Sequence, residues 1–156
     1  MTIGELAHLE HHAPRRRRLR FRVRGESLGL KPTRTDQLVG EIEAGLSFRA
    51  LESLADLSGL SVPLIASTLG IPERTLARRK ADGRFAPDES ERLLRLSILF
   101  EKAVELFEGN VTGAVGWLTH PQRALSCQTP LAYSRTELGA REVENLIGRL
   151  EHGVFS

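Results

Sequence analysis

The stretch SVPLIASTLGIPERTLARRKADGR, residues 61–84, predicts two short helices joined by a tight turn. Ser61 is a favourable N-cap, and Pro63 suits the first turn of a helix, where its missing N–H costs little. Gly70 supplies the turn, and Pro72 falls in the first turn of the second helix. Two helices joined by such a turn over this length of chain have the spacing of a helix-turn-helix.

The second helix of this motif carries a basic face. At about 100° per residue, four of its polar side chains fall within an arc of roughly 140°, while Leu76 points to the opposite side. Guanidinium groups pair with guanine edges in the major groove or with phosphates, which is the chemistry of a recognition helix. A solvated face without a ligand is the alternative. We expect DNA binding here through Arg74, Thr75, Arg78 and Arg79.

The rest of the chain predicts an all-α protein. Only 5% of the residues are aromatic, and the 40% that are hydrophobic are mostly Leu, Ala, Val and Ile, which suits helix packing. Asp88 and Glu91 have the spacing of a capping box at the start of a long helix that ends at Gly109. Further helix starts are predicted at Asn110, Thr129 and Thr136.

The long helix carries a continuous apolar stripe. Such a stripe belongs to the core in most proteins, and it is also a place for the seam of a dimer. We expect a homodimer, because one helix-turn-helix reads a single half-site and symmetric operators are commonly read by two copies. Either the final helix or this stripe is expected to form the seam. The stripe consists of Leu96, Phe100, Val104 and Phe107.

The segment RRRRLRFRVRG, residues 15–25, alternates arginine with apolar residues, as a half-buried strand does. No second strand is predicted for it to pair with, so we interpret it as an arm outside the core. The arm is either disordered or contacts phosphates or an acidic partner. The expected organisation is a basic N-terminal arm over 1–33, a helical helix-turn-helix domain over 34–108 and a C-terminal domain over 109–156.

The charge distribution and the cysteine content indicate the kinds of partner and the cellular compartment to expect. Residues 1–84 hold 15 Lys and Arg against 10 Asp and Glu, while residues 85–156 hold 7 against 10, so the two halves are expected to meet different partners. The single cysteine, Cys127, excludes an intrachain disulfide and favours a reducing cytoplasm. No signal peptide or membrane span is predicted.

No constellation of residues predicts an enzyme. The glycines form neither a P-loop nor a dinucleotide fingerprint, and Cys127 has no His near it in the sequence. His8 and His12 are spaced i, i+4, but no Cys or carboxylate completes a familiar ligand set. We therefore expect no catalytic residue, no metal and no cofactor.

Several motifs of the chain resemble one family. They are LGIPERTLARRKADGRFAPDESERLLRL, WLTHPQRAL and TPLAYSRTELGAREVENLIGRLEHGVF, within residues 40–155. Their order and spacing resemble the Xre/MbcA/ParS-like antitoxins of bacterial toxin–antitoxin modules. In that family a glycine commonly precedes the Thr–Pro pair, whereas this chain has SCQTP, so the loop before Thr129 is expected to differ in detail.

The resemblance implies a two-part protein of the bacterial cytoplasm. Its helix-turn-helix binds the operator of its own operon, and its C-terminal segment neutralises a cognate toxin with a RES domain that consumes NAD. A stand-alone helix-turn-helix regulator with a C-terminal dimerisation or sensing domain is the alternative. The toxin-binding residues that the resemblance implies are Trp117, Arg149, Glu151, Gly153, Val154, Phe155 and Ser156.

Overall fold

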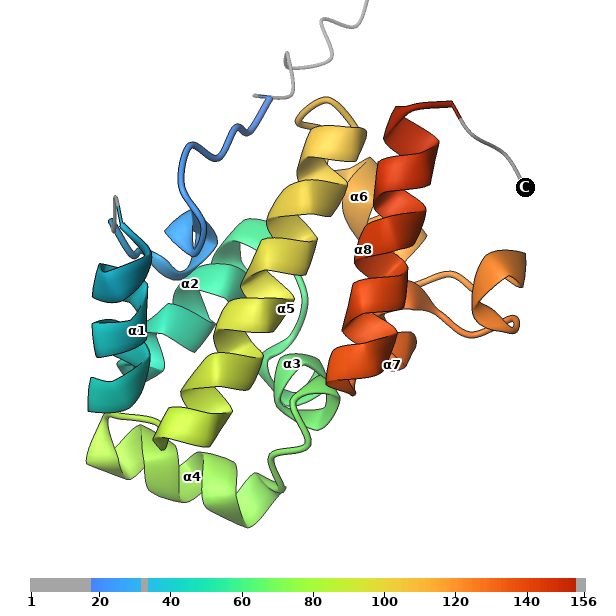
Figure 1. Cartoon of the computed structure of the whole chain (residues 1–156). Helices are drawn as coiled ribbons and strands as arrows, with labels where there is room; N and C mark the ends of the chain where they lie inside the picture. Colours follow the sequence, from blue (N-terminus) through green and yellow to red (C-terminus); the bar gives the residue numbers. More distant parts are fainter. Residues whose placement is uncertain (1–17, 32–33, 154–156) are drawn as a thin grey trace, which may run out of the picture.

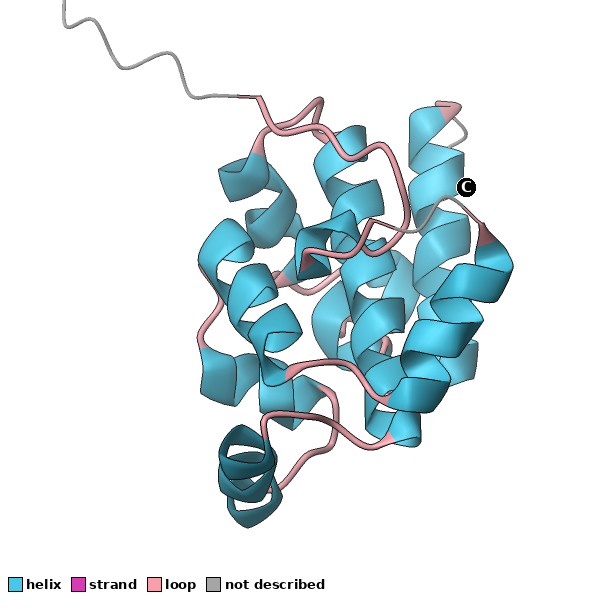
Figure 2. Cartoon of the chain, turned by 90° about the vertical axis from the view of Figure 1, so that its left-hand side faces the viewer, coloured by secondary structure: helices cyan, strands magenta, loops and turns pink. Residues whose placement is uncertain are grey.

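The computed structural model describes residues 18–31 and 34–153, and all the regular structure in these residues is helical (Figures 1 and 2). The all-α prediction is confirmed. The elements are η2 (Glu26–Leu28), α1 (Thr35–Ala44), α2 (Phe48–Ser58), α3 (Val62–Thr68), α4 (Glu73–Asp82), α5 (Pro87–Leu106), α6 (Val111–Leu118), η3 (Arg123–Leu125), α7 (Pro130–Tyr133) and α8 (Glu137–Glu151).

The helix starts follow from side-chain caps. As the sequence predicts, four residues cap helices by accepting a hydrogen bond from the backbone N–H of the third helical residue: Ser61, Asn110, Thr129 and Thr136. The predicted box of Asp88 and Glu91 is wrong, because Pro87 already begins α5. The third helical residue is therefore Glu89, and its Oε1 accepts from the Ala86 N–H at 2.8 Å.

Helix α5 is the centre of the molecule. It contacts α1 and α2 on one side and α6 and α8 on the other, and Figure 1 shows it crossing the bundle from α4 to the α5–α6 turn. Its apolar stripe lies inside one chain: Leu96, Phe100 and Val104 are at most 4% exposed. The expectation that this stripe forms a dimer seam is therefore wrong, because the monomer core has already buried it.

The segment over residues 18–31 packs on the bundle and is not a detached arm. Leu19, Phe21 and Val23 are half-buried while the arginines between them are exposed, so the predicted alternation is present, with a helix rather than a strand as its partner. The Phe21 ring meets the Phe100 ring edge to face at 5.8 Å. We call residues 18–31 the strap; the rest of the predicted arm, 1–17 and 32–33, lies outside the described residues.

A buried carboxylate anchors the strap. The two oxygens of Glu101, on α5, accept from the backbone N–H groups of Gly25 at 3.0 Å and Ser27 at 3.1 Å, and the Ser27 hydroxyl donates as well. Burial raises the pKa of the Glu101 carboxyl above its ordinary value, although these hydrogen bonds favour the charged form. The strap is thus fixed to the core by a residue 76 positions away in the sequence.

The replacement Glu101→Ala should lower the free energy of unfolding by about 1–3 kcal/mol, because it leaves two buried N–H groups without an acceptor. The raised pKa means that the Glu101 carboxyl stays protonated to a higher pH in the folded chain than in the unfolded chain. The loss should therefore be largest at acid pH and shrink as pH rises through that pKa. Urea unfolding at several pH values measures both effects.

The control is Glu105→Ala, at an exposed site on the same helix. Equal losses of stability in the two variants would contradict the role of Glu101.

Candidate nucleic-acid interface and C-terminal surface

Helices α3 and α4 form the predicted helix-turn-helix, with Gly70 in the turn and Ile71 buried beneath it. Pro72 is the N-cap of α4, so the helix begins at Glu73, one residue later than the sequence suggested. Leu76 is half-buried and packs against the core, as expected for the inner side of α4. No residue of α4 is fully buried, and the helix lies along the outer edge of the bundle (Figure 1).

The outward face of α4 combines arginines with small residues. Arg74 and Arg78 are exposed, and so are Ala77 and Ala81 beside them, whereas Thr75 is half-buried. Neither arginine makes a hydrogen bond or ion pair with another described residue. Small side chains between two free guanidinium groups allow a helix to approach base edges closely. The structure thus brings together two of the four predicted DNA-binding residues on one open face.

Arg79 is turned toward the body of the protein. Its Nε donates to Oε1 of Glu89 on α5 at 2.6 Å, and the two side chains are only 21% and 8% exposed. This hydrogen bond raises the pKa of the Arg79 guanidinium, which stays charged. The expectation that Arg79 shares the open stripe is therefore corrected: it lies at the inner flank of α4, where the buried carboxylate of Glu89 holds it.

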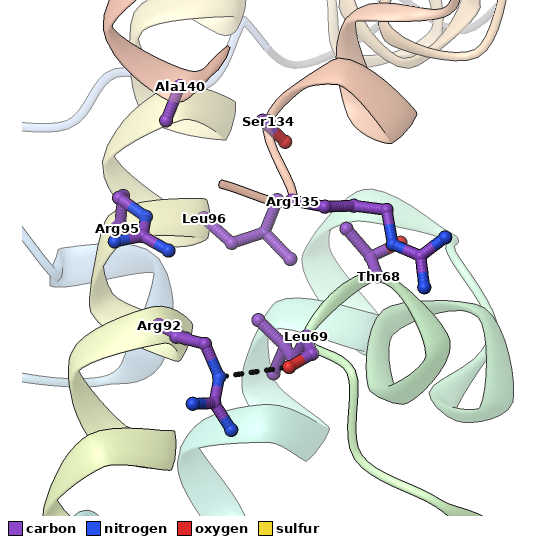
Figure 3. Close-up of a pocket in the computed structure, with 8 residues that line it drawn as sticks. All are labelled: Thr68, Leu69, Arg92, Arg95, Leu96, Ser134, Arg135 and Ala140. Carbon is purple, nitrogen blue, oxygen red and sulfur yellow. Dashed lines mark hydrogen bonds between the residues drawn. The ribbon is translucent and has the colours of Figure 1, made fainter. Parts of the chain in front are cut away.

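Further polar contacts fix both ends of the motif. After α4, the backbone pairs with the start of α2: the Phe48 N–H donates to the Gly83 carbonyl and the Phe85 N–H to the Leu46 carbonyl, both at 2.9 Å. Before α4, the Arg92 Nε donates to the Leu69 carbonyl at the end of α3, also at 2.9 Å (Figure 3). Sequence reasoning missed the roles of Glu89 and Arg92, because both act across separate helices.

A small pocket lies between the helix-turn-helix and the C-terminal helices. Arg92 and Arg95 on α5 line it together with Arg135 before α8, whose side chain extends past Thr68 (Figure 3). The Arg135 guanidinium lies 3.5 Å from the Ser67 carbonyl on α3. The pocket has a volume of about 10 Å³, which holds about one water molecule and no cofactor.

The predicted toxin-binding residues lie on two elements. Trp117, on α6, is half-buried against the core, and Arg149, in the last turn of α8, is also half-buried. Glu151 and Gly153 are exposed at the end of α8. The remaining three, Val154, Phe155 and Ser156, lie outside the described residues.

The corner between α7 and α8 explains one motif of the family resemblance. The Thr136 Oγ accepts from the Gly139 N–H at 3.0 Å and caps α8. A Cβ on Gly139 would lie 1.8 Å from the Tyr133 carbonyl oxygen, so another residue at this position would push the two helices apart. The Thr136–Gly139 pair is therefore a packing requirement and need not touch a partner.

The loop before α7 has an unusual backbone. Ser126 and Cys127 both have positive φ values, 55° and 62°, in the left-handed region that favours glycine. An antiparallel bridge between Gln122 and Gln128 closes the loop, and buried Leu125 anchors it. The structure therefore makes a glycine-type turn from two residues that each carry a Cβ.

The described residues contain no group of three or more His, Cys, Asp or Glu placed to hold a metal ion. His8 and His12 lie outside them. No helix among these residues is long and apolar enough to cross a membrane.

Two family models match the chain. The antitoxin Xre-like helix-turn-helix domain matches residues 37–97, and the antitoxin Xre/MbcA/ParS C-terminal toxin-binding domain matches residues 102–153. The first match ends and the second begins inside α5, so the two parts share this helix.

Three curated relatives share the name Antitoxin Xre. The one from Yersinia enterocolitica is 42% identical over 130 residues, which cover 83% of this chain and 88% of the relative. The one from Photorhabdus laumondii is 36% identical over 74% of this chain and 78% of its own length. The one from Pseudomonas putida is 33% identical over about half of each chain, 53% and 52%.

Replacing both Ser126 and Cys127 by glycine should raise the free energy of unfolding by about 1 kcal/mol. A left-handed conformation costs about 1–2 kcal/mol per residue that carries a Cβ, and the greater freedom of glycine in the unfolded chain offsets roughly 0.5–1 kcal/mol of each gain. Denaturant unfolding measures the change. The control is Ala124→Gly, in the same loop but without a positive φ, which should instead lower stability. If the double variant also lost stability, the turn would be unstrained.

Proposed function

The chain belongs to the antitoxin Xre family, and from this premise we propose that it neutralises a cognate toxin and represses its own operon by binding operator DNA. The family is one of DNA-binding and toxin-binding proteins, and we assign the chain no catalytic step and no cofactor. The match of the toxin-binding domain over residues 102–153 favours this function over a stand-alone regulator.

The observation that carries the DNA-binding part is the open face of α4. Arg74 and Arg78 are exposed and unpaired, and the small side chains beside them leave room for base edges. Arg79 has a different role in this proposal, because its pairing with Glu89 sets the angle at which α4 leaves the bundle. Arg74 and Arg78 thus contact the operator, and Arg79 positions them.

The toxin in this proposal carries a RES domain and consumes NAD, as the resemblance to the family implies. The chain's contribution is a binding surface around the exposed end of α8, formed by Glu151 and Gly153, and extended by the tail that follows. Phe155 is the aromatic residue of that tail, and it serves as an anchor in the toxin's NAD cleft. The protein acts in the bacterial cytoplasm.

A homodimer remains part of the proposal. Two copies would place two α4 helices on the half-sites of a symmetric operator. Because the stripe on α5 is buried within one chain, the dimer seam must lie on another surface. The sequence suggested the final helix as the alternative. The first turn of that helix bears Leu138, which is 75% exposed.

Replacing Arg78 or Arg79, which are adjacent on α4, should affect DNA recognition and stability separately. Arg78→Ala should weaken operator binding by about 1–3 kcal/mol if the side chain reads a base, and leave the melting temperature unchanged. Arg79→Ala should lower the melting temperature, because Glu89 loses its partner. Binding to operator DNA and thermal unfolding measure the two effects. Unchanged operator affinity in an Arg74→Ala, Arg78→Ala double variant would rule out α4 as the recognition helix.

Removing residues 153–156 should weaken toxin neutralisation while leaving operator binding intact. Aromatic anchors in desolvated pockets commonly cost about 2 kcal/mol or more when truncated, so Phe155→Ala in the full chain should reproduce most of the loss. The assay is NAD consumption by the toxin with equal amounts of full-length, truncated or Phe155→Ala antitoxin. Full inhibition by the truncated protein would place the inhibitory surface on the helices around Trp117 and Val143.

A further inference from the structure

The strap presents an ordered row of arginines that the function proposed above does not use. Arg18, Arg20, Arg22 and Arg24 are all exposed, whereas the apolar residues between them are half-buried. The backbone is irregular from Arg18 to Phe21, bends at Arg22 and Val23, and turns at Arg24 and Gly25. The result is a cluster of four exposed positive charges within seven residues at the surface of the molecule.

The described part of the chain does not neutralise this row. The guanidinium groups of Arg18, Arg20 and Arg22 make no hydrogen bond or ion pair with another described residue, and Arg24 donates only to the Thr35 hydroxyl at 3.2 Å. The four arginines line a groove of about 770 Å³ together with Glu105 and Glu108, and neither of these carboxylates forms an ion pair with them. A negatively charged ligand at the strap would therefore meet guanidinium groups that no described carboxylate pairs with.

The row is fixed in place at three points. The Leu19 N–H donates to the Gly109 carbonyl at 3.1 Å, Phe21 packs on Phe100, and Glu101 holds the backbone of Gly25. Gly109 has φ +88°, and a Cβ there would lie 2.8 Å from the Leu19 carbonyl oxygen, so this approach requires glycine. The backbone of a row held in this way loses little conformational entropy when the row binds a ligand.

The strap and α4 lie at different ends of α5. Arg79 of α4 meets α5 at Glu89, whereas the strap meets it at Glu101 and beyond, roughly 18 Å further along at ~1.5 Å per residue (Figure 1). Figure 2 shows the strap as a loop across the face of the bundle, away from α4. The arginine row is thus a second basic surface, separate from the open face of α4.

We propose that the row Arg18, Arg20, Arg22 and Arg24 is a second DNA-binding surface, which contacts phosphates without reading sequence. Four guanidinium groups within seven residues, none of them in an ion pair with a described residue, match a polyanion with a high density of phosphates, and each guanidinium group can donate two parallel hydrogen bonds to phosphate oxygens. DNA is also the polyanion that α4 contacts in the function proposed above. The surface supplies electrostatic affinity, and α4 supplies the specific contacts.

The test compares two variants that lose the same charge. Arg20→Gln with Arg22→Gln removes two members of the row, and Arg123→Gln with Arg141→Gln removes two exposed arginines elsewhere. Both pairs are placed in a chain that already carries Arg74→Ala and Arg78→Ala, so that α4 does not contribute. Binding of a random-sequence DNA duplex is followed by fluorescence anisotropy between about 50 and about 200 mM salt.

The strap variant should reduce the slope of log affinity against log salt by about 1.8, since each phosphate contact contributes about 0.9. The control variant should leave the slope unchanged. Equal slopes in the two variants would overturn the proposal. It would also be overturned if the strap variant kept its DNA slope but lost binding to the toxin, since the row would then bind an acidic protein. Operator recognition by α4 is tested separately, so the failure of one proposal does not imply that of the other.

Discussion

The burial of α5 is the constraint on which the rest of the structure depends. Its apolar side chains face both halves of the bundle, and residues such as Leu93, Leu99 and Ala103 are almost completely inaccessible. A helix covered on several sides loses part of its stabilisation whenever one neighbour moves away, because each neighbour hides part of the same apolar surface. The DNA-binding and toxin-binding parts of the family therefore share one core here, although two separate family models describe them.

Helix α4 is the exception to this apolar packing, and its polar attachments follow from its position. It has no fully buried side chain, so it gains little from the hydrophobic effect, and directional contacts must set its orientation. The ion pair of Arg79 with Glu89, the backbone pairing of Gly83 with Phe48 and the hydrogen bond of Arg92 with Leu69 provide them. These contacts fix the angle of α4 and leave its outer face exposed to solvent.

The strap shows the same division between an apolar inner side and a charged outer side. Phe21 and its apolar neighbours pack on α5, Glu101 satisfies the backbone, and the arginines remain in solvent. Glu101 and Glu89 thus play similar parts on the same helix. Each is a nearly inaccessible carboxylate whose hydrogen bonds fix a basic segment that the core itself does not enclose.

The sequence alone determined the helical class, the helix-turn-helix, the capped helix starts and the alternation within the strap. These features depend on residues within about four positions of one another, where capping chemistry and periodicity act directly. The tertiary structure decided which charged residues remain free. Arg79 shares its helix with Arg78 yet faces Glu89, and the predicted dimer stripe is already covered within one chain. Gly25 meets Glu101 across 76 positions. Such pairings depend on how helices stack around α5, and no local pattern encodes that arrangement.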